Sequence, residues 1–240
     1  MSTTTIDVRP ADDRFHTRLS WLDSHHSFSF GPHFDPANVG HGLLLVANDD
    51  VVAPGGGFGS HPHRDMEIVT WVLDGELEHR DSAGNHGVIR PGLAQRMSAG
   101  SGIVHSEENR SRDLPVHFLQ MWVVPDEVGI EPGYEQLDVS DRLVDGALVT
   151  VASGRGHEGA VHLHQAGAAM HVARLGAGDP VEVPAAPFVH VYVARGAVEL
   201  DGRRLGTGDA ARLTDAGVVT VVATEPAEVV VWETDSVAHR

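Results

Sequence analysis

The chain has 240 residues, 41% of them hydrophobic, and 34 acidic against 17 basic side chains give it a formal net charge of −17. No residue is cysteine or lysine, which excludes disulfides, thiolate metal sites, thiol nucleophiles and Schiff bases and leaves 17 histidines, carboxylates and hydroxyl groups to carry the chemistry. The acidic balance argues against direct nucleic-acid binding, and the lack of an apolar leader or of about 20 successive apolar residues predicts a cytoplasmic protein without a membrane span.

Short runs rich in β-branched and aromatic residues alternate with glycine and proline along the chain. Most runs are too short for helices, and their composition favours strands. Helical turns are expected only near Ala11–Arg18 and Tyr134–Leu137. Many short strands between glycine and proline turns predict an all-β sandwich or barrel. The main predicted strands are Gly42–Ala47, Glu67–Leu73, Val116–Val124, Leu148–Ala152, Met170–Leu175, Val189–Ala194, Val218–Ala223 and Glu228–Trp232.

The two halves of the chain carry the same pattern. Residues 71–78 (WVLDGELE) and 192–199 (YVARGAVE) both read as a strand, a turn glycine and a second strand. The repeat predicts an internal duplication with two similar β domains. We place them at residues 1–130 and 131–240, with the boundary in the glycine- and proline-containing stretch Pro125–Gly133. The glycine-rich stretch Ser153–Gly159 is the alternative boundary.

Two pairs of candidate metal ligands lie in the first half. His61 and His63 belong to the segment GSHPHRDME, and His105 and Glu107 to the segment GSGIVHSEEN. Residues i and i+2 of a strand point to the same face, so the side chains of each pair project together. If the two strands are neighbours inside a barrel, three imidazoles and one carboxylate converge. Such a set leaves positions of a six-coordinate metal open, as a catalytic site requires, and suits Fe(II), Mn, Co, Ni, Cu or Zn.

These motifs resemble the two signatures of the cupin superfamily and are more similar still to the pirin family, in particular to bacterial pirin-like quercetin dioxygenases. The similarity is strong over about residues 15–140. It implies two cupin-type β-barrels in tandem, of which the first binds metal. The segments that carry it are WLDSHHSFSF (21–30), NDD (48–50), HPHR (61–64), EHRDS with GN (78–85), MSAGSGIVHS (97–106) and QMW (120–122).

The resemblance also implies the ligands. His61, His63, His105 and Glu107 would bind one divalent transition metal per chain, with Fe(II) favoured and Ni, Co, Cu, Mn or Zn as alternatives. Cupins in general use a glutamate at the position of Glu67, which is therefore the alternative ligand or else a structural residue. Glu107 is the expected catalytic residue, a general base that loosens from the metal to take a substrate proton.

The implied activity is a metal-dependent dioxygenase that opens the heterocyclic ring of a flavonol such as quercetin, with O₂ as co-substrate and release of carbon monoxide. A monomer is expected rather than a dimer. The alternative is a metal-loaded pirin that regulates or binds another protein without turnover. A zinc-dependent isomerase is a third option, because cupins include such enzymes.

The remaining histidines and tryptophans are expected to be structural. The pair His162 and His164 is followed by no His-x-Glu motif in its half, so the second barrel is expected to lack a metal. His190 is expected to be a core histidine with hydrogen-bond partners. Packing or turn positions are predicted for His25, His26, His79 and His86, and core positions for Trp71 and Trp122.

Overall fold

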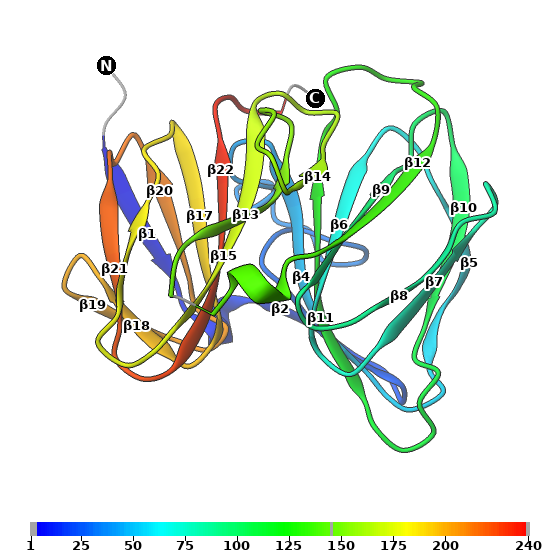
Figure 1. The fold of residues 1–240 in the computed structure, drawn as a ribbon, viewed down its shortest axis with the longest axis horizontal. Coiled ribbons are helices and arrows are strands. Elements are labelled where there is room, and N and C mark those ends of the chain that lie inside the picture. The colour runs from blue at the N-terminus through cyan, green and yellow to red at the C-terminus, as the bar shows by residue number, and fades with distance from the viewer. Residues whose placement is uncertain (1–3, 145, 239–240) are drawn as a thin grey trace.

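The computed structural model describes residues 4–144 and 146–238 and confirms an all-β chain with two barrels side by side (Figure 1). In these ranges each barrel consists of a seven-stranded sheet facing a four-stranded sheet. Helical structure in the described ranges is confined to two 3₁₀ turns, η1 (Ala11–Asp13) and η2 (Ser140–Arg142). Neither turn approaches a bilayer-spanning length, so the described residues contain no membrane helix.

The first barrel is built from strands β2 to β12. Its large sheet has the order β12-β9-β6-β11-β4-β3-β2, and its small sheet has the order β5-β10-β7-β8. The strands are β2 (Phe15–Arg18), β3 (Leu22–His26), β4 (Leu44–Val52), β5 (Gly57–His63), β6 (Glu67–Asp74), β7 (Leu77–Asp81), β8 (His86–Ile89), β9 (Leu93–Ser98), β10 (Ile103–Glu108), β11 (Val116–Val123) and β12 (Gly133–Asp138).

The second barrel repeats this plan. Its large sheet has the order β1-β20-β17-β22-β15-β13-β14, and its small sheet has the order β16-β21-β18-β19. The strands are β1 (Thr5–Arg9), β13 (Val149–Ser153), β14 (Val161–His162), β15 (Ala168–Leu175), β16 (Pro180–Val183), β17 (Phe188–Arg195), β18 (Ala197–Leu200), β19 (Arg203–Gly206), β20 (Ala210–Thr214), β21 (Val219–Ala223) and β22 (Ala227–Thr234).

Two glycines mark equivalent turns in the barrels. Gly75 follows β6 with φ of 78°, and Gly196 follows β17 with φ of 73°. A Cβ on Gly75 would lie 2.7 Å from the carbonyl oxygen of Pro115, and one on Gly196 would lie 2.1 Å from that of Pro226. Both turns therefore require glycine, on conformational and on steric grounds. The matching strand orders and turns confirm the predicted duplication.

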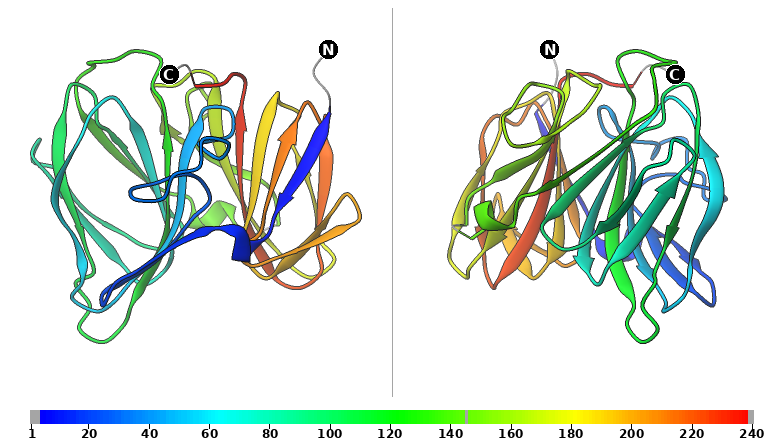
Figure 2. Two further views of the ribbon diagram at one scale, coloured as in Figure 1. Left: turned by 180° about the vertical axis from the view of Figure 1, so that it is seen from behind. Right: turned by 45° about the vertical axis from the view of Figure 1, so that its right-hand side comes forward.

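The outer strands of the large sheets come from unexpected parts of the chain. β1 pairs with β20 of the second barrel, and the chain then passes to the first barrel (Figure 2). β12 pairs with β9 of the first barrel, so the helical turn expected at Tyr134–Leu137 is wrong. This segment forms a strand because pairing with the edge of the sheet outweighs its local helix preference. The division at residues 130 and 131 stays a prediction, while these pairings define the strands of each barrel.

The largest apolar cluster lies between the barrels, where the outer faces of the two seven-stranded sheets meet. Trp71 on β6 is fully buried there, as predicted, and its Nε1 donates a hydrogen bond to Glu228 Oε1 at 2.7 Å. Trp232 on β22 is buried beside Met121, 3.1 Å from its sulfur. Because each large sheet is covered on both faces, β22 is buried along its whole length.

Candidate metal centre

The two predicted ligand pairs lie on neighbouring strands of the first barrel's small sheet. β5 and β10 are antiparallel, and His105 lies opposite His61. A bulge between His105 and Glu107 shifts the register, so that Glu107 lies opposite Phe58. His105 and Glu107 are both buried, with 2% exposure. The expected adjacency of the strands is therefore present.

Three imidazoles converge at this point. The ring centroids of His61, His63 and His105 are 4.4 to 4.9 Å apart, and one nitrogen from each ring lies within 4.8 Å of the others. His61 Nδ1 donates to the carbonyl oxygen of Gly59 at 2.7 Å, which leaves Nε2 free of this bond. The Nε2 atoms of His63 and His105 are buried without a hydrogen-bond partner. Such orphaned buried nitrogens are rare in proteins, and a metal ion would satisfy them.

Glu107 lies on the buried side of the three histidines, in a second group with His79 and His105 rather than in one group with His61 and His63. Its carboxylate lies within 4.8 Å of ring nitrogens of His79 and His105. Its Oε2 accepts a hydrogen bond of 2.7 Å from Gln120 Nε2. Gln120 Oε1 in turn accepts a hydrogen bond of 3.3 Å from Trp122 Nε1. Two side chains of β11 therefore fix the orientation of the glutamate.

The protonation states suit metal binding. Burial and neighbouring imidazoles lower the pKa of His63 to about 4 and that of His105 to about 2, so both rings are neutral at pH 7, the form that ligates metals. Burial raises the pKa of Glu107 to about 7, and it raises the pKa of Asp50 in the adjoining cavity to about 7. A divalent cation would compensate the buried negative charge that ionisation of these carboxyls creates.

A chain of hydrogen-bonding groups supports His105 from behind. His105 Nδ1 lies 3.4 Å from His79 Nδ1, and His79 Nε2 lies 3.2 Å from Asp81 Oδ2. His79 is fully buried against the ring of Tyr134. His79 packs in the interior as expected, and its contact with His105 adds the kind of interaction that orients metal-binding imidazoles. The signal lay in the motif EHRD, because His79 and Asp81 share one face of β7, the neighbour of β10.

Glu67 lies elsewhere. Its Oε2 accepts a hydrogen bond of 3.0 Å from the backbone N–H of His164, at the seam with the second barrel. Among the described residues, Glu67 belongs to no cluster of metal-ligating side chains. Of the two roles weighed for Glu67, its position matches the structural one.

An open cavity of about 220 Å³ adjoins the ligands. Trp122 borders it, with its ring 4.8 Å from His63 and edge-on to Phe30. The half-buried Trp122 also packs against a small apolar cluster, so the core position expected for it is only partly confirmed. His26 lines it as a buried residue, and its Nδ1 lies 2.9 Å from Asn48 Oδ1. The wall combines aromatic rings with polar groups, which suits a planar molecule bearing hydroxyls. The remaining lining residues are Thr17, Leu22, Ser24, Gly31, Pro32, Asp50, Phe58, His61, Glu107 and Gln120.

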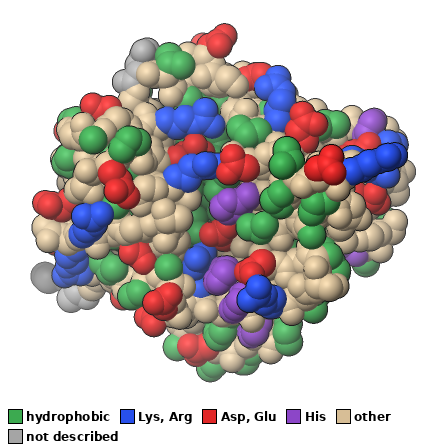
Figure 3. All heavy atoms as spheres, turned by 90° about the horizontal axis from the view of Figure 1, so that it is seen from below, with side chains coloured by type: hydrophobic (Ala, Val, Ile, Leu, Met, Phe, Trp, Pro, Cys, Tyr) green, Lys and Arg blue, Asp and Glu red, His purple; other side chains and the backbone are tan. Residues whose placement is uncertain are grey.

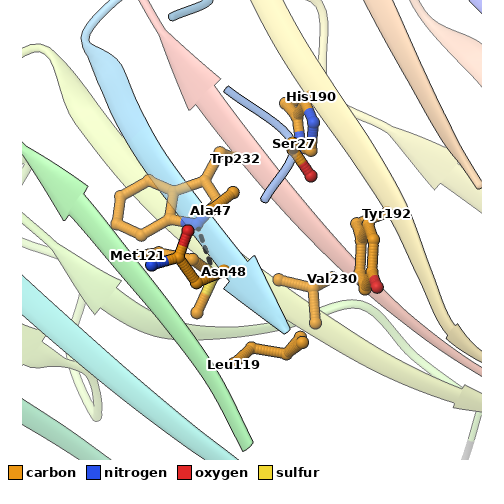
Figure 4. Close-up of a pocket in the computed structure, with 9 residues that line it drawn as sticks. All are labelled: Ser27, Ala47, Asn48, Leu119, Met121, His190, Tyr192, Val230 and Trp232. Carbon is orange, nitrogen blue, oxygen red and sulfur yellow. Dashed lines mark hydrogen bonds between the residues drawn. The ribbon is translucent and has the colours of Figure 1, made fainter. Parts of the chain in front are cut away.

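The second barrel has no comparable cluster among its described residues. His190 is buried as expected, but its Nε2 has no partner, against the prediction of a satisfied histidine. It borders a cavity of about 10 Å³ between the barrels, with room for about one water (Figure 4). His162 and His164 are exposed with ring centroids 4.8 Å apart, and neither belongs to a described group of three ligands.

Known proteins resemble this chain over nearly its whole length. Residues 8–123 match the Pirin family, and residues 150–233 match the Quercetinase C-terminal cupin domain. The chain is 39% identical to the quercetin 2,3-dioxygenase of Escherichia coli, over 95% of this chain and 98% of that one. It is 57% identical, over 96% of both chains, to a Mycobacterium tuberculosis protein whose name assigns that activity provisionally. The bacterial pirin YhhW of E. coli in complex with nickel(II) gives a TM-score of 0.90 at 37% identity, covering 97% and 100% of the two chains.

Proposed function

The chain belongs to the pirin family, and from that membership and the geometry of the first barrel we propose that it is a metal-dependent flavonol dioxygenase of the quercetin 2,3-dioxygenase type. One observation carries the proposal. The buried, unpartnered Nε2 atoms of His63 and His105 converge with His61 beside a cavity lined by aromatic and polar groups. This combination provides ligands, open coordination positions and room for a substrate in one place.

We propose that His61, His63, His105 and Glu107 bind one divalent transition metal per chain. Fe(II) remains the favoured native metal, and the nickel(II) complex of the related YhhW makes Ni(II) the first alternative. When bound, the metal supplies Lewis-acid chemistry that lowers the pKa of a substrate hydroxyl group. His79 and Asp81 would hold the ring of His105 in the orientation that this binding requires.

Glu107 is the proposed base. Without a cation, burial raises its pKa to about 7, so the carboxylate would take up a proton readily once it loosens from the metal. Gln120 holds Oε2, so a proton from the substrate 3-hydroxyl would be taken by the other carboxylate oxygen. Trp122 fixes Gln120 and also borders the cavity, which links the position of the base to the wall that contacts substrate.

The cavity supports a flavonol as the substrate class. Phe30, Phe58 and Trp122 offer aromatic surfaces for a flat ring system. Thr17 and His26 offer groups that hydrogen-bond to ring hydroxyls. The reaction consumes O₂, opens the heterocyclic ring and releases carbon monoxide, with the chain's contribution being binding, orientation and proton transfer.

The test begins with anaerobic purification and elemental analysis. The protein is then loaded with Fe(II), Ni(II), Co(II) or Cu(II), and quercetin loss, O₂ uptake and carbon monoxide are measured together. At least one form should consume quercetin and O₂ in equal amounts, while Glu107→Gln should lower that rate by about 100-fold or more. If every form holds metal but none consumes quercetin, the enzyme proposal fails in favour of a metal-loaded binding protein.

A further inference from the structure

We propose a second metal site, formed by His16, Asp23 and His25 on the outer face of the β2–β3 hairpin. Its ligand would be a divalent cation of intermediate hardness, such as Zn²⁺, Ni²⁺ or Cu²⁺, which imidazole and carboxylate groups bind together. The site is separate from the three histidines of the barrel, and its existence does not depend on the proposed dioxygenase activity.

The hairpin brings the three side chains to one face. β2 and β3 are antiparallel, with His16 opposite His25 and Arg18 opposite Asp23. Directly opposed residues and their diagonal neighbours on one sheet face lie within contact distance. The two imidazoles are stacked, with ring centroids 4.3 Å apart and planes inclined by 6°. Asp23 Oδ1 lies 2.9 Å from His16 Nε2 and 3.6 Å from His25 Nδ1.

These distances suit a tetrahedral ion. Zinc bonds to nitrogen and oxygen of about 2.0–2.1 Å place neighbouring ligand atoms about 3.4 Å apart. The two measured separations from Asp23 Oδ1 lie on either side of this value, and all three ligand atoms lie within 4.8 Å of one another. Because the stacked ring planes are nearly parallel, the imidazoles would have to turn about their side-chain bonds to direct both nitrogens at one ion, with water in the fourth position.

The proposed ligands are open to solvent. The side chains of His16, Asp23 and His25 are 41%, 39% and 34% exposed, so an ion reaches them directly from solvent. Histidines lie beside acidic and arginine side chains on the surface seen in Figure 3. Arg18 Nε lies 3.7 Å from Asp23 Oδ2, so it steadies that oxygen and leaves Oδ1 to the imidazoles.

The proposed metal site lies on the same two strands that form one wall of the barrel's cavity. Thr17, Ser24 and His26 alternate along the same two strands with the proposed ligands, and they line the cavity of the barrel. A cation on the outer face would clamp β2 to β3 and so stiffen one wall of that cavity. The part of this statement that concerns substrate rests on the proposed function, whereas the metal site itself does not.

Zinc binding to the full-length protein tests the site. Equilibrium dialysis against Zn²⁺ followed by elemental analysis should give two ions per chain for the wild type and one for the double variant His16→Gln/His25→Gln. Loss of groups that only orient ligands already lowers metal affinity by about 10–100-fold, so removal of two ligands should abolish the second equivalent. Asp23→Asn should weaken that equivalent by about tenfold or more.

Two further variants make the result decisive. The control variant His162→Gln/His164→Gln removes an exposed histidine pair that belongs to no group of three metal-ligating side chains among the described residues. This variant should still bind two ions. His61→Ala/His105→Ala should lose the barrel equivalent and keep the surface one. Circular dichroism confirms folding of each variant. If His16→Gln/His25→Gln binds as many zinc ions as the wild type, or if His61→Ala/His105→Ala binds none, the proposal is overturned.

Discussion

The two barrels have the same strand order, but their interiors differ in polarity and in how continuously they are packed. The interior apolar residues of the second barrel form one continuous cluster, whereas those of the first fall into two smaller clusters. The difference lies in one cross-strand row at equivalent positions. The row is Gln95, Thr70, Gln120 and Asn48 in the first barrel and Ala211, Val191, Val231 and His171 in the second.

This comparison shows how one fold carries a site in one copy and a packed core in the other. In the first barrel the polar row lies between the apolar clusters, next to Glu107 and the histidines. In the second barrel Ala211, Val191 and Val231 make three of the four positions apolar, and these residues belong to one continuous apolar cluster. The cavity of the first barrel costs it packing contacts. The filled core of the second barrel leaves no room for a substrate. The predictions below test this contrast.

The largest effect is expected when a proposed metal ligand of the first barrel is truncated. His105→Ala should lose the bound metal and lower quercetin turnover by well over about 100-fold, because it removes a proposed ligand rather than a group that orients one. His190→Ala truncates a buried histidine of β17, outside the proposed site, and should leave metal content and turnover unchanged in protein that remains folded. Metal analysis and O₂ uptake measure both, and equal losses would remove the distinction between the barrels.

A polar substitution in the interior of the second barrel should destabilise the protein. Val231→Gln places an amide without partners in the valine core and should lower the free energy of unfolding by about 3 kcal/mol in urea titrations. Val231→Leu has a similar volume but no polar atoms, so it should lose clearly less. The same loss in both variants would mean that volume, rather than polarity, separates the two rows.

The metal-free protein should lose stability as pH rises. Glu107 has a folded pKa of about 7, above its unfolded value of about 4.3, so the unfolded state ionises first and stability falls between these values, by about 3 kcal/mol in total. In the second barrel burial raises the pKa of Glu233, but the hydrogen bond from His171 and nearby positive charges lower it overall. A carboxyl with a lowered pKa does not lose stability as pH rises, so Glu233 cannot produce this fall.

Urea titrations from pH 5 to pH 8 measure this trend. Glu107→Gln should reduce the fall, and what remains should come from Asp50, whose pKa is raised in the same direction. Parallel curves for wild type and variant would show that Glu107 is not the titrating group.

The smallest effect is expected within the polar row itself. Gln120→Leu removes the hydrogen bond to Glu107 and should lower turnover about tenfold while metal is retained. Gln95→Leu changes the same row at a residue with no described bond to Glu107, and its turnover should stay within about twofold. Steady-state rates with matched metal content decide the point, and a larger loss in the Gln95 variant would contradict the role given to Gln120.

Much of this architecture follows from local sequence. β-branched runs such as Glu67–Leu73 predict β6 almost to its ends, and the i, i+2 spacing predicts that His61 and His63 share a face. The ligand role of these histidines remains a prediction. Residues that act through neighbouring strands were not predictable in the same way. His79 reaches His105 only because β7 lies beside β10, and strand adjacency is a property of the fold rather than of any local pattern.

The edge strand β1 has a consequence for how the protein is made. Thr5 pairs with Thr214, so β1 leaves the ribosome about 200 residues ahead of its partner strand. At about 5–20 residues per second, it waits roughly 10–40 s. Throughout that interval its backbone donors and acceptors face water or another chain. A strand translated early is therefore among the last of this fold to be placed, and β1 is where crowding of nascent chains would readily misdirect assembly.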